Sequence, residues 1–196
     1  MTTRDAEGEA LPPLKEVSAR TPEEQHRDTL RSGDEALSAR WLLRPGARGA
    51  MGALMDECAR AAEAFCAAVE SFDAERWLAE RAGPDPSTRS PRAICAHVCG
   101  AARRYADYIR KARGLPFTEA FVMTEGVPAA PADVRPLLRD ALHYTEGALD
   151  GLHELDEEAI GKLVFRVRWG PTFDPDMLLE HAVMHLLRHR RQLLRW

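Results

Sequence analysis

The 196-residue chain lacks any apolar run close to the roughly 20 residues that a membrane-spanning helix needs. Residues 1–7 show neither the basic start nor the apolar centre of a secretory signal peptide. The chain also has no glycine-rich phosphate-binding loop and no Gly-x-Ser-x-Gly sequence, which marks the nucleophile of many serine hydrolases. We therefore expect a cytoplasmic protein that does not contact membranes and uses neither of these catalytic motifs.

Cysteine is scarce, and its spacing excludes the common cysteine-based sites. The chain has four cysteines and no Cys-x-x-Cys pair: Cys58, Cys66, Cys95 and Cys99. A chain of this size without a signal peptide is not expected to carry a disulfide framework. Cys95 and Cys99 share one face of a predicted helix, and His97 falls on nearly the opposite face. The four thiols are therefore predicted to be small buried apolar groups rather than metal ligands.

An excess of positive charge is also missing. The 27 basic and 31 acidic residues give a net charge of −4, which offers no bulk attraction to nucleic acid. Arginines gather only near the C-terminus, where cations complement the dipole at the end of a helix. The alternative is that one of them holds an anionic substrate. The arginines in question are Arg188, Arg190, Arg191 and Arg195.

The first 48 residues differ from the rest of the chain. They contain several prolines, dense mixed charge and few large apolar residues before Trp41, Leu42 and Leu43. The sequence Thr-Pro-Glu-Glu at 21–24 has the form of a capping box, which predicts a helix over 22–43 with those three apolar residues as its candidate anchors. We expect residues 1–15 to be mobile. The chain thus divides into an N-terminal extension, 1–48, and a metal-binding bundle, 49–196.

From Gly49 onward, apolar residues recur at the three- and four-residue steps of amphipathic helices. Proline- and glycine-rich stretches separate the helices, and a short extended piece is predicted near 163–169. Four helices with two long connections predict an all-α four-helix bundle in which one crossover is required. The predicted helices cover about 51–70, 91–113, 133–152 and 175–192, and the long connections cover 114–131 and 156–171.

The last predicted helix carries three histidines at four-residue spacing: His181, His185 and His189. Asp174 can cap its first free N–H groups, and Pro175 suits its first turn. Residues four apart project on nearly one face, about 6 Å apart, so two of these imidazoles can reach one transition-metal ion. Two ligands do not complete a site, and a third must come from another helix.

His97 is the natural third ligand. It follows Ser90 and Pro91, which predict a capped helix start, and small apolar residues around it indicate a buried stretch. A buried imidazole must find a hydrogen-bond partner or a metal. The alternative for a lone histidine is a core residue bonded to a backbone carbonyl, but the second helix with paired histidines favours a metal site.

The sequence His185-x-x-x-His189-Arg190-x-Gln192, together with His97 seven residues after a capping serine, resembles the DinB/YfiT-like metalloenzyme superfamily. The resemblance covers roughly residues 51–196 and rests on these short stretches. It implies a four-helix bundle in which His97, His185 and His189 bind a divalent metal. Two positions depart from the family pattern, because Arg89-Ser90 stands where Trp-Ser is frequent and Arg191 stands where Gly is frequent. Neither departure removes a ligand.

His181 leaves the choice of ligands open, because the pair His181/His185 has the same spacing as His185/His189. The trailing Arg190-x-Gln192 favours the second pair. His181 is then a spare ligand or a half-buried histidine one turn earlier. Asp176 and Glu180 are further candidates, either as groups that orient a ligand or as favourable charge near the helix start.

Three histidines bind Zn²⁺, Ni²⁺ or Fe²⁺ and leave a position open for water or a thiolate. The resemblance implies a metal-dependent thiol transferase or hydrolase that acts on a small cytosolic substrate, with a low-molecular-weight thiol as a candidate partner. The alternative is a non-catalytic metal-binding or stress-related bundle. We expect the open position to face a cavity roofed by the connections 114–131 and 156–171. Bundles of this size often pair, so a homodimer is a further expectation.

Overall fold

The computed structural model describes Thr21 and residues 32–196. These residues are mostly helical and contain one small two-stranded sheet, which confirms the predicted all-α class. The long helices are α2 (Gly49–Val69), α4 (Pro91–Ala112), α5 (Val134–Leu149) and α7 (Pro175–Leu193). The short elements are α3 (Ala74–Leu78), α6 (Glu157–Gly161), three 3-10 turns (Pro86–Thr88, Pro131–Asp133 and Leu152–Glu154), β1 (Phe165–Arg166) and β2 (Thr172–Phe173).

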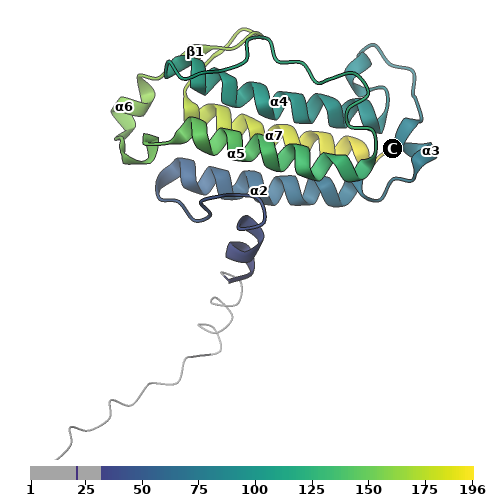
Figure 1. Cartoon of the computed structure of the whole chain (residues 1–196), viewed down its shortest axis with the longest axis horizontal. Coiled ribbons are helices and arrows are strands. Elements are labelled where there is room, and N and C mark those ends of the chain that lie inside the picture. The colour runs from purple at the N-terminus through teal and green to yellow at the C-terminus, as the bar shows by residue number, and fades with distance from the viewer. Residues whose placement is uncertain (1–20, 22–31) are drawn as a thin grey trace, which may run out of the picture.

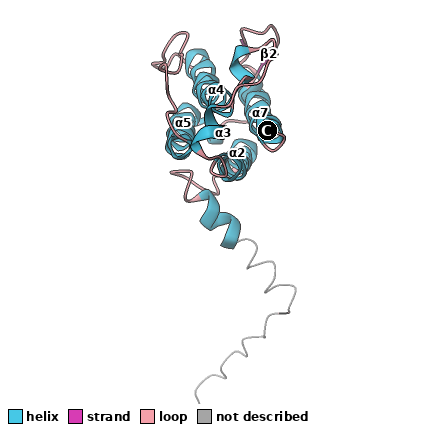
Figure 2. Cartoon of the chain, turned by 90° about the vertical axis from the view of Figure 1, so that its right-hand side faces the viewer, coloured by secondary structure: helices cyan, strands magenta, loops and turns pink. Residues whose placement is uncertain are grey.

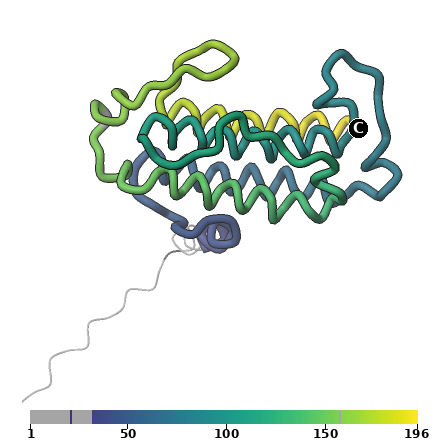
Figure 3. Tube along the Cα trace, turned by 45° about the horizontal axis from the view of Figure 1, so that its top comes forward, coloured from purple at the N-terminus to yellow at the C-terminus, as the bar shows by residue number. Residues whose placement is uncertain are grey.

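The four long helices pack side by side around one core, as the end-on view shows (Figure 2). α2 contacts α5 and α7, and α4 contacts the same two helices, so α2 and α4 occupy opposite corners. The connection 113–130 runs back along the outside of the helices, and α4 and α5 therefore point in the same direction (Figures 1 and 3). This is the crossover that the long connections predict.

The helix starts follow the predicted caps. The Ser90 hydroxyl accepts a hydrogen bond from the backbone N–H of Ala93 at 3.1 Å, and α4 begins at Pro91. The Asp174 carboxylate accepts one from the N–H of Met177 at 2.9 Å, and α7 begins at Pro175. Each cap satisfies a free N–H at the helix start, while proline supplies a φ that already suits the first turn.

The predicted extended piece becomes a hairpin beside α4. β1 and β2 pair in antiparallel fashion, with Phe165 opposite Phe173. The Phe165 ring stacks on Tyr108 of α4 at 6.0 Å, and the Tyr108 hydroxyl accepts a hydrogen bond from the backbone N–H of Arg168 at 3.0 Å. These contacts fix the tip of the hairpin, which includes Trp169, against α4.

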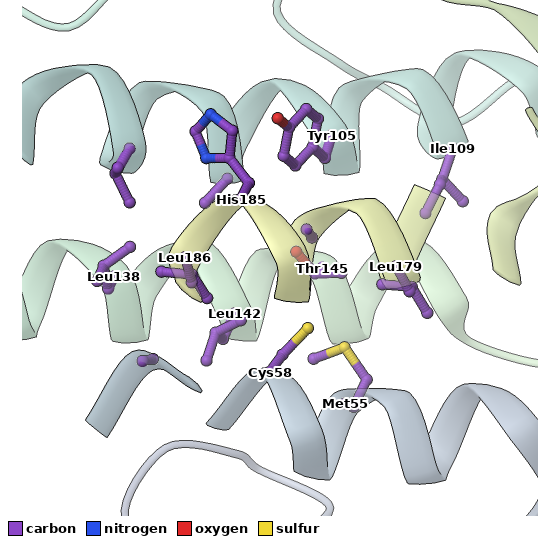
Figure 4. A pocket seen from close by; sticks show the side chains of 14 residues that line it. Met55, Cys58, Tyr105, Ile109, Leu138, Leu142, Thr145, Leu179, His185 and Leu186 are labelled. Atoms are coloured by element: carbon purple, nitrogen blue, oxygen red, sulfur yellow. The ribbon is translucent and has the colours of Figure 1, made fainter. Parts of the chain in front are cut away.

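The core between the helices is apolar, and the four cysteines belong to it as predicted. Burial raises the pKa of the Cys58 thiol to about 12, so the thiolate that a metal needs is not available there at neutral pH. Figure 4 shows Cys58 and Met55 facing Leu142 and Leu186 in this core, with His185 above them. His185 therefore stands over an apolar interior.

Residues 41–44 of the N-terminal extension contact the body. In the described part, its helix covers 32–38 and ends at Ser38 rather than at the predicted Leu43. Trp41 and Leu42 are buried as anchors, and the Trp41 indole donates to Glu63 at 2.8 Å. Leu43 is 67% exposed, so its predicted anchoring role is wrong. The predicted helical residues 22–31 and the predicted mobile residues 1–15 lie outside the described residues.

A buried carboxylate explains why the extension turns at this point. The side chain of Glu146, on α5, accepts the backbone N–H groups of Leu43 and Arg44, each at 2.8 Å. The Arg44 guanidinium donates in turn to the backbone carbonyl of Glu146 at 2.8 Å. The chain then passes so close to α2 that a Cβ at Gly52 would lie 1.8 Å from the carbonyl oxygen of Ala47.

No helix in the described residues has the length and hydropathy to cross a membrane.

Candidate metal centre

Three of the predicted ligands meet between α4 and α7. His97 comes from α4, and His185 and His189 lie one turn apart on α7. The Nε2 atoms of His97 and His185 are 3.0 Å apart, and one potential ligand atom from each of the three rings lies within 4.8 Å of the others. Two nitrogens bound to one divalent ion by bonds of about 2.0–2.1 Å lie at most about 4.2 Å apart, so the three rings need only a small adjustment to bind a single ion. The cluster could therefore hold a metal ion.

Gln192 fixes the orientation of His189. The Nδ1 atom of His189 lies 2.5 Å from Oε1 of Gln192, one turn further along α7. An amide oxygen only accepts hydrogen bonds, so Nδ1 carries the proton and Nε2 keeps its lone pair free. Partners of this kind hold a ligand in the tautomer that a metal requires. The resemblance grouped Gln192 with the two histidines, and the structure gives that residue a physical role.

Burial keeps the three imidazoles neutral. The pKa of His185 is lowered to about 2 and that of His97 to about 4, mainly by burial and secondly by the proximity of His189. The pKa of His189 is also lowered, mainly by burial. The cause for His185 is visible in Figure 4, where its ring stands above the apolar core. Neutral rings are the form that binds metal.

His181 lies beside the cluster without joining it. Its ring centroid is 6.2 Å from that of His185, and its ring stacks on Trp169 at 5.2 Å. The Tyr105 ring packs edge-on against His181 and His185, at 5.4 and 5.7 Å. His181 thus belongs to an aromatic wall next to the three-histidine cluster.

The cluster faces a cleft of about 470 Å³. The hairpin residues Arg168 and Trp169 line one side, and Asp85, from the connection after α3, lines another. The predicted roof is right for the connection 156–171 and wrong for the connection 114–131, which contributes no lining residue. That connection acts indirectly, because the carbonyl of Phe121 accepts a hydrogen bond from Arg104 at 3.2 Å.

The cleft is rich in positive charge. Arg104, Arg168 and Arg188 line it, and Asp85 is the one acidic side chain among its described lining residues. Burial lowers the pKa of Arg104, and the neighbouring charge of Arg168 lowers it further. Neither Arg104 nor Arg168 forms an ion pair with a described carboxylate. An anion that enters the cleft would meet uncompensated guanidinium groups.

The C-terminal arginines divide between different surroundings. Arg188 lines the cleft, whereas Arg190 turns away and donates to the backbone carbonyl of Ala64 at 3.2 Å. Arg191 is exposed and does not line the cleft. Asp176 and Glu180 are likewise absent from the cleft lining.

Sequence reasoning did not identify Arg104, Arg168 or Tyr105 as part of the site. Arg104 and Tyr105 lie two turns after His97 on α4, and that spacing was a usable signal for residues sharing its face. Arg168 had no such signal. It reaches the cleft only because the hairpin folds over α4.

The pH dependence of metal binding follows from the lowered pKa values. A proton competes with metal only near the pKa of a ligand ring, and all three rings have pKa values below the ordinary range: about 4 for His97, about 2 for His185, and a lowered pKa for His189. We expect zinc affinity to change less than about 3-fold between about pH 7.5 and pH 5.5, whereas each ordinary imidazole with a pKa near 6.5 would cost roughly 10-fold. Equilibrium dialysis against zinc across this range is the measurement.

The same shifts predict that the stability of the metal-free chain, unlike its zinc affinity, depends on pH. Unfolded histidines take up protons near pH 6.5, while folded His97 and His185 do not, so the unfolded state binds more protons between about pH 6.5 and pH 4. Stability should therefore fall as pH drops through this window.

A steep loss of zinc affinity between about pH 7 and pH 5.5 would contradict the conclusion that the three imidazoles of the metal-free protein are neutral.

The arrangement has the chemistry of an open metal site rather than a closed one. Three imidazoles leave at least one coordination position of a tetrahedral ion unfilled, and the cluster faces a cleft rather than a sealed core. No protein-family model matches the chain, and no curated protein matches it either. The geometry of the three histidines and their cleft is therefore what supports a function.

Proposed function

We propose that the protein is a metal-dependent enzyme of the DinB/YfiT-like type, a four-helix bundle with His97, His185 and His189 as ligands of a zinc, nickel or iron ion. The observation that carries the proposal is the convergence of three neutral imidazoles from two helices on one open cleft. Structural metal sites have no need of a cleft, whereas catalytic sites keep a position for substrate. The resemblance favours a thiol transferase or a hydrolase as the reaction class.

The bound ion would supply one piece of chemistry, a lowered pKa for a water or thiol at its open position. The protein residues do the rest. Gln192 holds His189 in the ligand tautomer, and the rings of Tyr105 and Trp169, 6.1 Å apart, form an aromatic wall of the cleft. Burial raises the pKa of Tyr105 to about 12, so it stays a neutral phenol that can donate a hydrogen bond.

The arginines indicate the charge of the substrate. Arg104 and Arg168 face the same cleft as the histidines and have no described carboxylate partner. A carboxylate on the substrate would relieve their mutual repulsion and accept charge-assisted hydrogen bonds. We therefore include a small anionic molecule, with a carboxylate-bearing thiol as the simplest example, in the proposed function.

The test uses cobalt-substituted protein and two thiols that differ in charge. Both 2-mercaptoethanol and 3-mercaptopropionate should change the visible spectrum of the bound cobalt, and His189→Ala should remove the change. Arg168→Met should weaken the effect of 3-mercaptopropionate by about 10-fold and leave that of 2-mercaptoethanol unaltered, because only the former offers a carboxylate. Arg166→Met is the matched control, since Arg166 lies on the same hairpin and does not line the cleft.

The second candidate function is a non-catalytic bundle that binds metal without turnover. If neither thiols nor small anions alter the cobalt spectrum, the site is closed to ligands and this alternative replaces the enzyme. If Arg168→Met changes the spectral effects of both thiols equally, the proposal of an anionic substrate is contradicted, while that of an open metal site stands.

A further inference from the structure

α7 exposes more large hydrophobic side chains than the other three long helices. Of the eleven large hydrophobic side chains that are exposed in the described chain, four lie on α7 or its C-cap, and none lies on α2, α4 or α5. A contiguous exposed apolar surface on a folded protein is typical of a site that binds another protein, a membrane or a ligand. The four are Met177, Met184, Leu187 and Leu194, with exposed fractions of 46, 63, 38 and 59%.

These four residues form a single stripe. Their spacings of seven, three and seven residues are those of the a and d positions of a heptad, which keep one seam along a helix. Glu180 and Arg191 occupy the two remaining positions of the same seam, and both are exposed. They are eleven residues apart, about 16 Å along the helix, so they cannot pair with each other within one chain.

The stripe is complementary to itself when a second copy lies antiparallel. Met177 then faces Leu194 of the second copy, Met184 faces its Leu187, and Glu180 faces its Arg191. All three pairings are centred on one point, between residues 185 and 186. A two-fold axis through that point repeats each contact, as an isologous interface requires.

From this we infer that the protein forms a homodimer in which α7 packs antiparallel on α7 of a second copy. Two apolar pairs at the centre and two at the ends would be buried, with an ion pair of opposite charges between them on each side. Only this register sets apolar residues opposite apolar residues and Glu180 opposite Arg191, because a shift by one turn would set Glu180 against an apolar residue. The opposite charges of Glu180 and Arg191 are what select a second copy as the partner.

The interface leaves the metal centre intact. His185 and His189 project from α7 toward α4 and the cleft, while Met184 and Leu187 are not among the cleft lining residues. Arg188 borders both surfaces, since it lines the cleft and follows Leu187 directly. The inference is independent of the proposed activity and holds for the metal-free protein.

The test measures the mass of the full chain by sedimentation velocity between about 1 and 100 µM. The wild type should be a dimer at the upper end of this range. Met184→Glu should weaken dimerisation by about 30-fold or more, because it buries an unpaired charge at the centre of the interface. Val122→Glu is the matched control, because Val122 is 78% exposed but lies in the connection 113–130, away from α7. It should leave the dimer unchanged.

Charge exchange tests the register. Glu180→Arg and Arg191→Glu should each weaken the dimer by about 10-fold, since each sets like charges against one another, and the double variant should restore it. Circular dichroism and zinc binding by each variant should match the wild type, which separates a lost interface from a lost fold. A wild-type monomer at 100 µM, or a double variant weaker than both single ones, would overturn the antiparallel dimer.

Discussion

Replacing His185 with alanine is expected to lower the affinity of the protein for a divalent metal by about 100-fold or more. His185 is the central member of the cluster, because its Nε2 lies 3.0 Å from that of His97 and its ring centroid lies 4.4 Å from that of His189. Loss of a residue that merely orients a ligand typically costs 10- to 100-fold in affinity, so loss of a ligand should cost at least the upper value. Elemental analysis of purified protein and zinc competition against a chelating dye would measure it.

His181→Ala is the matched control, because it removes a histidine one turn earlier on the same helix. It should keep most of the bound metal, since His181 stacks on Trp169 outside the cluster. Gln192→Ala should fall between the two variants, with a loss of about 10-fold, because His189 would lose the partner that fixes its tautomer. A loss in His181→Ala as large as in His185→Ala would show that the ligand pair is His181 and His185.

The parts of this site that sequence predicts are the local ones. Helical spacing alone brings His185 and His189 to one face of α7, and the caps at Ser90 and Asp174 set where α4 and α7 begin. His97 could be matched to them because a buried imidazole among small apolar residues calls for a partner. These inferences need only the geometry of a helix.

The parts that escaped prediction depend on contacts between distant segments. Arg168 enters the cleft because a two-stranded hairpin is pinned to Tyr108, and nothing near Arg168 in the sequence encodes that contact. The helix of the extension stops at Ser38 because burial of Trp41 and Leu42 requires the chain to turn. Local capping signals predicted a longer helix, and tertiary packing overrode them.

Glu146 is the clearest case of a residue whose role depends on contacts between distant segments. Glu146→Ala is expected to lower the free energy of unfolding by about 2–3 kcal/mol, or the melting temperature by about 5–10 °C for a chain of this size. The carboxylate is 4% exposed and accepts two backbone N–H groups, at Leu43 and Arg44, which would both lose their acceptor. Each hydrogen bond to a charged group contributes about 1.5–3 kcal/mol, and relief of the cost of burying the charge offsets part of the sum.

Thermal unfolding followed by circular dichroism measures the effect, and two variants sharpen it. Glu146→Gln should lose about half as much, because one amide oxygen can still accept an N–H while the amide nitrogen cannot. Glu158→Ala should change stability by less than about 0.5 kcal/mol, since that carboxylate is exposed and its ion pair with Lys162 lies on the surface. Zinc affinity should be unchanged in all three variants, because Glu146 does not line the metal cleft.

Limited proteolysis with trypsin tests which segment of the chain Glu146→Ala loosens. In the native protein the Arg44 guanidinium is held by the Glu146 carbonyl and by Asp150, so trypsin should cleave after Arg44 slowly. Glu146→Ala frees the backbone at 43–44 and should speed that cleavage before the helices of the body are cut. Cleavage after Arg44 at the wild-type rate, with stability within about 0.5 kcal/mol of Glu158→Ala, would mean that contacts other than those of the Glu146 side chain hold the extension on the body.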